Sequence, residues 1–260
     1  MRKTTVRVRG ADIAVFEPGS DSRPGAPLLV WAHGWGHAHR NMLPLAEGTR
    51  RLGSSVLLDL PGFGDSPPPP GPWGTEDYAD AVAEFLAARP PERRVWVGHS
   101  FGCRVGLQLA SRHPELVGGL FLIAAAGLPR TRSLPERIRF AARRWTFRTA
   151  RFLTPEGPRR DALRARFGSA DYARAGPMRP VLVNTVGEDL SETARAVRVP
   201  TVLLYGDKDN ETPPEIGARL NKLMPQSQLI VLRGFDHWSV LTDGRHQIVQ
   251  RLSEFVEQIA

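Results

Sequence analysis

The sequence RRVWVGHSFGCRVGLQLASRH, residues 93–113, decides the fold. It begins with β-forming residues and ends in a helical pattern of apolar residues ahead of Pro114. Between them, Gly98-His-Ser-Phe-Gly102 matches the pattern Gly-X-Ser-X-Gly, which places Ser100 on a sharp turn from a strand to a helix. The glycines two residues to either side let neighbouring backbone pass without a Cβ clash. The pattern predicts a serine hydroxyl held above the edge of a sheet.

Buried strands alternate with helices on both sides of this turn. Apolar runs typical of strands buried on both faces are found at 27–32, 55–59, 119–124, 200–205 and 228–232. An antiparallel pair is expected at 4–9 and 11–17. Helices are expected at about 40–52, 75–88, 214–223 and 244–258, the second with Thr75 as its N-cap. The alternation predicts an α/β fold: a doubly wound, mostly parallel sheet covered on both faces.

The segment 127–198 interrupts this alternation with few strand signals and many arginines. It holds 16 Arg against 7 Asp and Glu, which accounts for the whole net charge of +8. We therefore expect one core formed by 1–126 and 199–260, with 127–198 inserted as a helical, arginine-rich piece. Within it, the stretch from Pro135 predicts a basic amphipathic helix with Trp145 on its apolar side.

The positive charge has two competing explanations. One is an arginine-biased composition on a tolerant surface; the other is a basic face that attracts an anionic substrate or lipid surface. A nucleic-acid partner is disfavoured because no recognition motif accompanies the charge. A membrane surface is less favoured than a helix covering the site, and the oligomeric state is left open.

The N-terminus and the single cysteine indicate a compartment. The first 15 residues carry charges without the apolar core of a signal peptide. No run approaches the ~18 apolar residues of a membrane-spanning helix. Cys103 has no partner for an internal disulfide, which suits a reducing environment. These features predict a cytoplasmic protein.

A serine nucleophile needs a base and a group that orients the base. In an open parallel sheet the chemistry gathers at the carboxyl ends of the strands. His237 follows the apolar run at 228–232, which favours it among the seven histidines. Asp209 leaves the strand at 200–205 at the same edge, and Asp207 is the alternative acid. A metal site is a further possibility at the three neighbouring histidines, His33, His37 and His39. It is disfavoured because no Cys or carboxylate shares that cluster in the sequence.

The order Ser100, Asp209, His237, together with the turn at 98–102, resembles the α/β-hydrolase superfamily over nearly the whole chain. Five motifs carry the resemblance: Gly98 to Gly102, Gly206-Asp-Lys-Asp209, His237-Trp238, His33-Gly-Trp-Gly36 and Asp59-Leu-Pro-Gly-Phe-Gly64. The resemblance implies Ser100 as nucleophile, His237 as general base and acid, and Asp209 as the orienting carboxylate. It also implies an oxyanion hole formed by the backbone N–H groups of Trp35 and Phe101.

The resemblance further implies that 127–198 is a cap over the active site, and that no metal or organic cofactor is required. Aspartate-nucleophile relatives are disfavoured because serine occupies position 100. The aromatic side chains of Trp35, Phe101, Trp145 and Trp238 indicate a partly apolar substrate pocket.

The resulting expectation is a carboxylesterase-like serine hydrolase acting on a small, partly apolar acyl substrate. The alternatives are a carbon–carbon bond hydrolase or thioesterase whose cap arginines hold an anionic substrate, and a ligand-binding protein without catalysis.

Overall fold

The computed structural model describes residues 1–21, 23, 25–90, 92–130, 145–146, 154, 157, 172 and 174–259. The amphipathic helix predicted from Pro135 lies outside the described residues, apart from Trp145 and Thr146. The boundaries of the insertion at 127–198 therefore stay a prediction.

The core is an eight-stranded sheet in the order β1-β2-β4-β3-β5-β6-β7-β8. The strands β3 to β8 run parallel, whereas β1 pairs with β2 and β2 with β4 in the antiparallel sense. The strand bounds are Arg2–Val8, Ala11–Glu17, Leu28–Ala32, Ser54–Asp59, Arg94–His99, Gly119–Ile123, Thr201–Gly206 and Ser227–Leu232, for β1 to β8 in that order.

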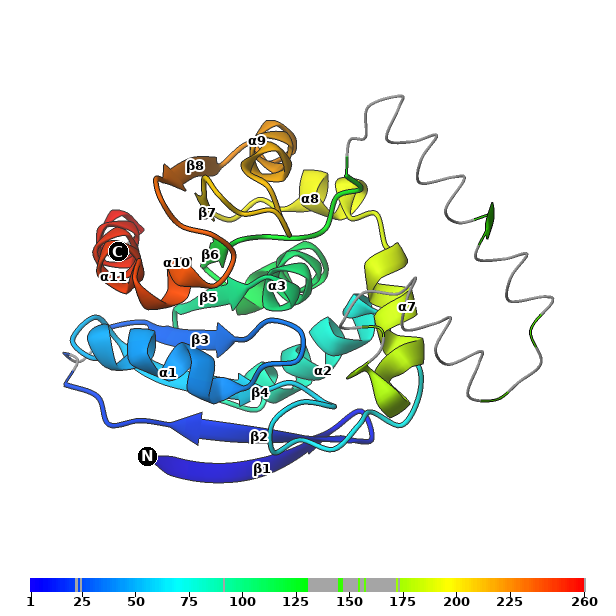
Figure 1. The fold of residues 1–260 in the computed structure, drawn as a ribbon. Coiled ribbons are helices and arrows are strands. Elements are labelled where there is room, and N and C mark those ends of the chain that lie inside the picture. Colours follow the sequence, from blue (N-terminus) through cyan, green and yellow to red (C-terminus); the bar gives the residue numbers. More distant parts are fainter. Residues whose placement is uncertain are drawn as a thin grey trace.

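Helices cover both faces of the sheet (Figure 1). Helices α1, α10 and α11 pack together on one face, and α2, α3, α8 and α9 form the layer on the other. Helix α7 stands beyond the end of the sheet toward which β3 points (Figure 1). The helix bounds are α1 His39–Gly48, α2 Thr75–Ala87, α3 Phe101–Arg112, α7 Arg179–Gly187, α8 Ser191–Ala196, α9 Pro214–Leu223, α10 Ser239–Thr242 and α11 Arg245–Gln258. The predicted doubly wound, mostly parallel α/β fold is confirmed.

Alternating side chains along each central strand build two cores. In β3, Val30 and Ala32 join the core beneath α2 and α3, whereas Leu29 and Trp31 join the core beneath α1 and α11. This alternation follows from the period of two residues along a strand. Because both faces are covered, every residue of β3 is buried, which explains its continuous apolar sequence.

The N-cap of α2 differs from the prediction. Gly74 holds that position, and its N–H donates to the Asp77 carboxylate at 2.9 Å. Thr75 is the first helical residue; its N–H and hydroxyl donate to the carboxylate of Glu188, at 2.7 and 2.5 Å. The prediction of a Thr75 cap was wrong because a carboxylate 113 residues away supplies the acceptor at this helix terminus.

Several contacts attach residues 174–190 to the core, where Met178, Val181 and Leu190 join the buried cluster. Met178 packs against Gly62, where an added Cβ would lie 2.2 Å from the methionine methyl carbon. The Asn184 amide donates to the Pro72 carbonyl at 2.6 Å. The carboxylate of Glu188 accepts from the start of α2, as described above. These contacts hold α7 beside the carboxyl ends of the strands.

Candidate active site

Ser100 follows strand β5 directly and precedes helix α3. Its φ of +48° lies in the left-handed region, which residues with side chains rarely adopt. A Cβ at Gly98 would lie 2.8 Å from the carbonyl carbon of Gly102, and one at Gly102 only 2.4 Å from the carbonyl oxygen of Ala32. The N–H of Ser100 donates to the carbonyl of Ile123 at 3.0 Å, which ties the turn to β6. Close backbone contacts therefore fix this serine in a strained turn.

His237 and Asp209 meet at the same edge of the sheet, on the loops after β8 and β7. The Nδ1 atom of His237 lies 2.8 Å from Oδ2 of Asp209, and the Thr212 hydroxyl donates to the same oxygen at 2.8 Å. The N–H groups of Glu211 and Thr212 each donate to Oδ1 at 2.8 Å. Because a carboxylate accepts hydrogen bonds, Nδ1 carries the proton of a neutral imidazole and Nε2 is left as the basic nitrogen.

The surroundings of Asp209 keep it ionised. Burial raises the pKa of its carboxyl, but hydrogen bonds from His237 and Thr212 outweigh burial and bring the pKa below its ordinary value. Asp207 has a different role, since its Oδ1 accepts from the N–H of Gly234 at 2.6 Å on an exposed part of the loop. Of the two candidate aspartates, Asp209 is the one that contacts the histidine.

The backbone N–H groups of Trp35 and Phe101 remain available near the serine. Phe101 is the first residue of α3, so its N–H has no partner within the helix. In the described part of the chain, neither of these two N–H groups donates to another residue. The N–H of Gly102 donates to the carbonyl of His33 at 3.1 Å, which joins the two loops. Such paired donors stabilise a negative oxygen that develops beside a nucleophile.

The histidines at 33 and 39 are occupied by hydrogen bonds within the fold. His33 accepts from the N–H of Leu60 at 3.1 Å through Nε2 and donates to the carbonyl of Gly34 at 2.8 Å through Nδ1. Burial lowers the pKa of His33 to about 4, so it is neutral at physiological pH. The Nδ1 atom of His39 lies 3.0 Å from Asp59. Among the described residues, no group of three or more His, Cys, Asp or Glu side chains is placed to hold a metal ion.

Two further titratable groups pack around the turn. His99 is buried with its Nε2 3.1 Å from the carbonyl oxygen of His237, and burial lowers the pKa of His99 well below its ordinary value. Cys103 is also buried; its sulfur lies 3.2 Å from the carbonyl of Gly98, and burial raises the pKa of the thiol. Both residues stay neutral, and they pack in the interior beside the turn that carries Ser100.

A pocket of about 940 Å³ opens above these residues. Trp35 and Trp238 line it, and the Trp238 indole stacks on His37 with ring centroids 4.1 Å apart. Phe101 and Trp145 were also predicted in the pocket, but neither is among its described lining residues. Phe101 is only 4% exposed and packs edge-on against Trp35, and Trp145 is 74% exposed. Among the described residues, the lining is Trp35, Gly36, His37, Gly62, Phe63, Gly64, Ser100, Arg174, Ala175, Met178, Glu211, His237 and Trp238.

Several residues of this site were not predicted from the sequence. Arg174, Ala175 and Met178 come from the arginine-rich insertion, where no local pattern separates them from their neighbours. Glu211 and Thr212 follow Asp209 by two and three residues, and this spacing on a strand-end loop is the signal that could have found them.

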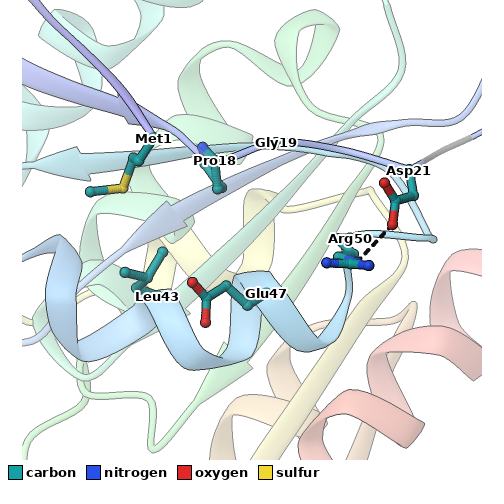
Figure 2. Close-up of a pocket in the computed structure, with 7 residues that line it drawn as sticks. All are labelled: Met1, Pro18, Gly19, Asp21, Leu43, Glu47 and Arg50. Atoms are coloured by element: carbon teal, nitrogen blue, oxygen red, sulfur yellow. Dashed lines mark ion pairs between the residues drawn. The ribbon is translucent and has the colours of Figure 1, made fainter.

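A second pocket, of about 520 Å³, lies away from this edge, between α1 and the chain around β1 and β2 (Figure 2). Its lining includes Leu43, Glu47 and the ion pair of Asp21 with Arg50 at 2.7 Å. Among the described residues that line it, none also lines the first pocket and none is a predicted catalytic residue.

Fold and pocket together define a class of protein: a hydrolase of the α/β type, in which loops at the strand ends bring a strained serine, a histidine and a buried aspartate to one edge. The model of the alpha/beta hydrolase family matches residues 29–251, and the chain belongs to this family.

The chain is also similar to named bacterial enzymes. It is 31% identical over 236 residues to a pimeloyl-[acyl-carrier protein] methyl ester esterase of Neisseria meningitidis (serogroup A), covering 83% of this chain and 73% of that protein. It is 39% identical over 100 residues to the biotin biosynthesis bifunctional protein BioHC of Cellvibrio japonicus, covering 38% of this chain and only 19% of that protein. These matches confirm the expectation of an α/β-hydrolase enzyme of the esterase kind.

Solved structures agree with the fold. The crystal structure of a membrane phospholipase A, described as a novel bacterial virulence factor, has a TM-score of 0.76 at 26% identity, covering 99% of this chain and 86% of that one. Among the described residues of the present chain, no helix is long and apolar enough to cross a membrane.

Proposed function

We propose that the chain is a serine esterase in which Ser100, His237 and Asp209 form the catalytic triad. The observation that carries the proposal is the 2.8 Å contact of His237 Nδ1 with the buried Asp209 carboxylate, on loops that share a pocket with the strained Ser100. A histidine oriented in this way has its second nitrogen free to accept the serine proton.

The proposed cycle has two halves. Ser100 Oγ attacks the ester carbonyl carbon while its proton moves to His237 Nε2; the carbonyl oxygen becomes negative and accepts hydrogen bonds from the N–H groups of Trp35 and Phe101. The carbon–oxygen bond to the alcohol then breaks, and Nε2 returns the proton to the departing alkoxide. Water repeats the sequence on the acyl-enzyme and releases the acid. Every proton passes through His237, and Asp209 stabilises the imidazolium.

The substrate class follows from the pocket and the relatives. The aromatic rings of Trp35, Phe63 and Trp238, with Met178, favour a partly apolar acyl group. The names of the Neisseria relatives make a methyl ester on a carrier-bound acyl chain the first physiological substrate to test. Arg174, Ala175 and Met178 line this pocket, which supports the assignment of 127–198 as a cap that shapes it.

A second candidate is favoured by Arg174. This arginine lines the pocket and has no ion-pair partner among the described residues, so its charge is available to an anionic group. A thioester or carbon–carbon bond hydrolase acting on an anionic substrate would use the same triad with Arg174 as an anchor.

The experiment is hydrolysis of p-nitrophenyl esters from acetate to decanoate by the wild type and by Ser100→Ala. We expect turnover that peaks at one chain length and falls at least 10³-fold in the variant. Equal activity of Ser100→Ala would overturn the triad. If neither protein hydrolyses any ester yet both bind an acyl ligand, the chain is a binding protein on a hydrolase fold.

A further inference from the structure

A carboxylate that the proposed cycle does not use lies beside the catalytic histidine. Glu211 lines the pocket, and its Oε2 is 3.7 Å from Nε2 of His237. Asp209 already occupies Nδ1, so the imidazole has one carboxylate at each nitrogen. The two carboxylates differ in access, because the side chain of Asp209 is fully buried, whereas that of Glu211 is 56% exposed. A substrate can therefore approach Glu211 directly.

The position of Glu211 is fixed from two sides. Its backbone N–H donates to Asp209 at 2.8 Å. Its Oε1 accepts from the indole Nε1 of Trp238 at 3.2 Å, and that indole stacks on His37. The carboxylate is thus held in the pocket instead of sweeping freely through solvent.

The position of Glu211 beside Nε2 of His237 indicates which part of a substrate Glu211 faces. In the proposed cycle, Nε2 of His237 returns the proton to the departing alcohol oxygen, which must come within about 3 Å of that nitrogen. The Glu211 carboxylate then lies within about 7 Å of the same oxygen. At such a distance in a partly enclosed site, a unit charge acts strongly on any charge carried by the alcohol part. Arg174 also lines the pocket, but Glu211 is the charged side chain adjacent to the proton donor.

We propose that Glu211 is a specificity-determining residue of the leaving-group side, favouring esters with a cationic alcohol part over neutral ones and disfavouring anionic ones. The inference rests on the proposed esterase function. It assigns Glu211 no proton transfer and no bond to the substrate. The triad performs the hydrolysis, and the fixed carboxylate selects among alcohol parts by charge.

The test compares three butyrate esters with the same acyl part, those of choline, 3,3-dimethylbutanol and 3-hydroxypropanesulfonate. The first two have nearly the same shape and differ by one positive charge. The variants are Glu211→Gln, which retains an oxygen for Trp238, Glu211→Lys, and the matched control Glu257→Gln, which removes a carboxylate on α11 outside the pocket. Ratios of kcat/KM between esters are compared across variants, so that differences in intrinsic ester reactivity cancel.

We expect the choline to dimethylbutyl ratio to fall about tenfold in Glu211→Gln, to fall further in Glu211→Lys, and to be unchanged in Glu257→Gln. The ratio of kcat/KM for the sulfonate ester to that for the dimethylbutyl ester should rise in both Glu211 variants. Ratios within twofold of wild type in both Glu211 variants, with hydrolysis intact, would overturn the inference and leave the esterase function standing. If the wild type hydrolyses none of the three esters, or if Ser100→Ala keeps full activity, the proposed esterase function itself is overturned. Circular dichroism of each variant checks folding.

Discussion

The loops at the strand ends and the segment 174–190 both contribute residues to the candidate active-site pocket, but they are held in different ways. The loops that carry Ser100, Asp209 and His237 are fixed by backbone contacts and buried hydrogen bonds. The segment 174–190 is attached mainly through side chains, such as Met178 on Gly62 and the Glu188 carboxylate on α2, with one backbone hydrogen bond from Leu190 to Gly127.

This difference separates chemistry from substrate choice. The proposed catalytic groups need positions accurate to a fraction of an ångström, which backbone packing supplies. The wall of the pocket has only to match the shape of the substrate. A segment attached mainly through side chains can provide that shape, and a few substitutions in it can change the shape. Substitutions in the strand-end loops should therefore lower activity and stability far more than substitutions in 174–190.

The largest expected effect is at the acid. Asp209→Asn should lower kcat on a p-nitrophenyl ester by roughly 10⁴-fold, because an amide no longer orients the imidazole or stabilises its charge. Asp207→Asn should lower kcat by less than about threefold, since its carboxylate contacts Gly234 and not His237. Steady-state kinetics on both variants provide the check. A larger loss in Asp207→Asn than in Asp209→Asn would reverse the assignment of the acid.

Next in size is the turn itself. Gly102→Ala should lower the free energy of unfolding by about 3 kcal/mol, because the new Cβ would lie 2.4 Å from the backbone of β3 and α3 would have to move away. Gly71→Ala is the matched control, since nothing lies within 4 Å of a Cβ there. Urea unfolding of both variants measures the difference. Equal stability would mean that the turn is not sterically determined.

A smaller effect concerns pH. Burial lowers the pKa of His33 to about 4, and that of His99 well below its ordinary value, so the folded chain binds fewer protons than the unfolded chain between pH 4 and 6.5. Their contribution to stability is complete above pH 6.5 and is lost as the pH falls. The free energy of unfolding should drop by about 2 kcal/mol from pH 7 to pH 5 for His33 alone. Urea titrations at the two pH values test this, and an unchanged midpoint would contradict it.

The smallest effect is expected in the segment 174–190. Glu188→Gln should cost about 1 kcal/mol of stability, because Thr75 loses a charged acceptor at the start of α2. Glu192→Gln is the control: it removes an exposed carboxylate paired with Arg195 and should cost less than about 0.5 kcal/mol. Thermal unfolding distinguishes the two. A loss in Glu188→Gln as large as that in Gly102→Ala would erase the contrast between the two regions.

The parts of the fold that local sequence determines were predictable. The apolar runs placed the central strands to within one or two residues, because burial on both faces leaves a continuous apolar signal. The helix at 214–223 was placed at its observed bounds. The helix predicted at 40–52 ends earlier, at Gly48, since the chain turns at Thr49, whose hydroxyl donates to the Leu45 carbonyl.

The candidate site divides in the same way. Ser100, Asp209 and His237 follow strand ends, so topology alone brought them to one edge. The contact of Glu188 with Thr75 spans 113 residues, and no local pattern announces it. Glu211 was missed because its proposed role depends on the distance of its carboxylate from Nε2 of His237, which the sequence does not give. Trp145 was predicted in the pocket, yet its side chain is 74% exposed, and most of the predicted helix around it lies outside the described residues.

The most direct test of the central claim is covalent labelling by a fluorophosphonate, located by peptide mass spectrometry in the wild type and in Ser100→Ala. We expect one adduct per chain, on Ser100, with esterase activity lost in proportion to labelling and no adduct in the variant. An active enzyme that is not labelled, or that is labelled on another residue with Ser100→Ala still reacting, would contradict it.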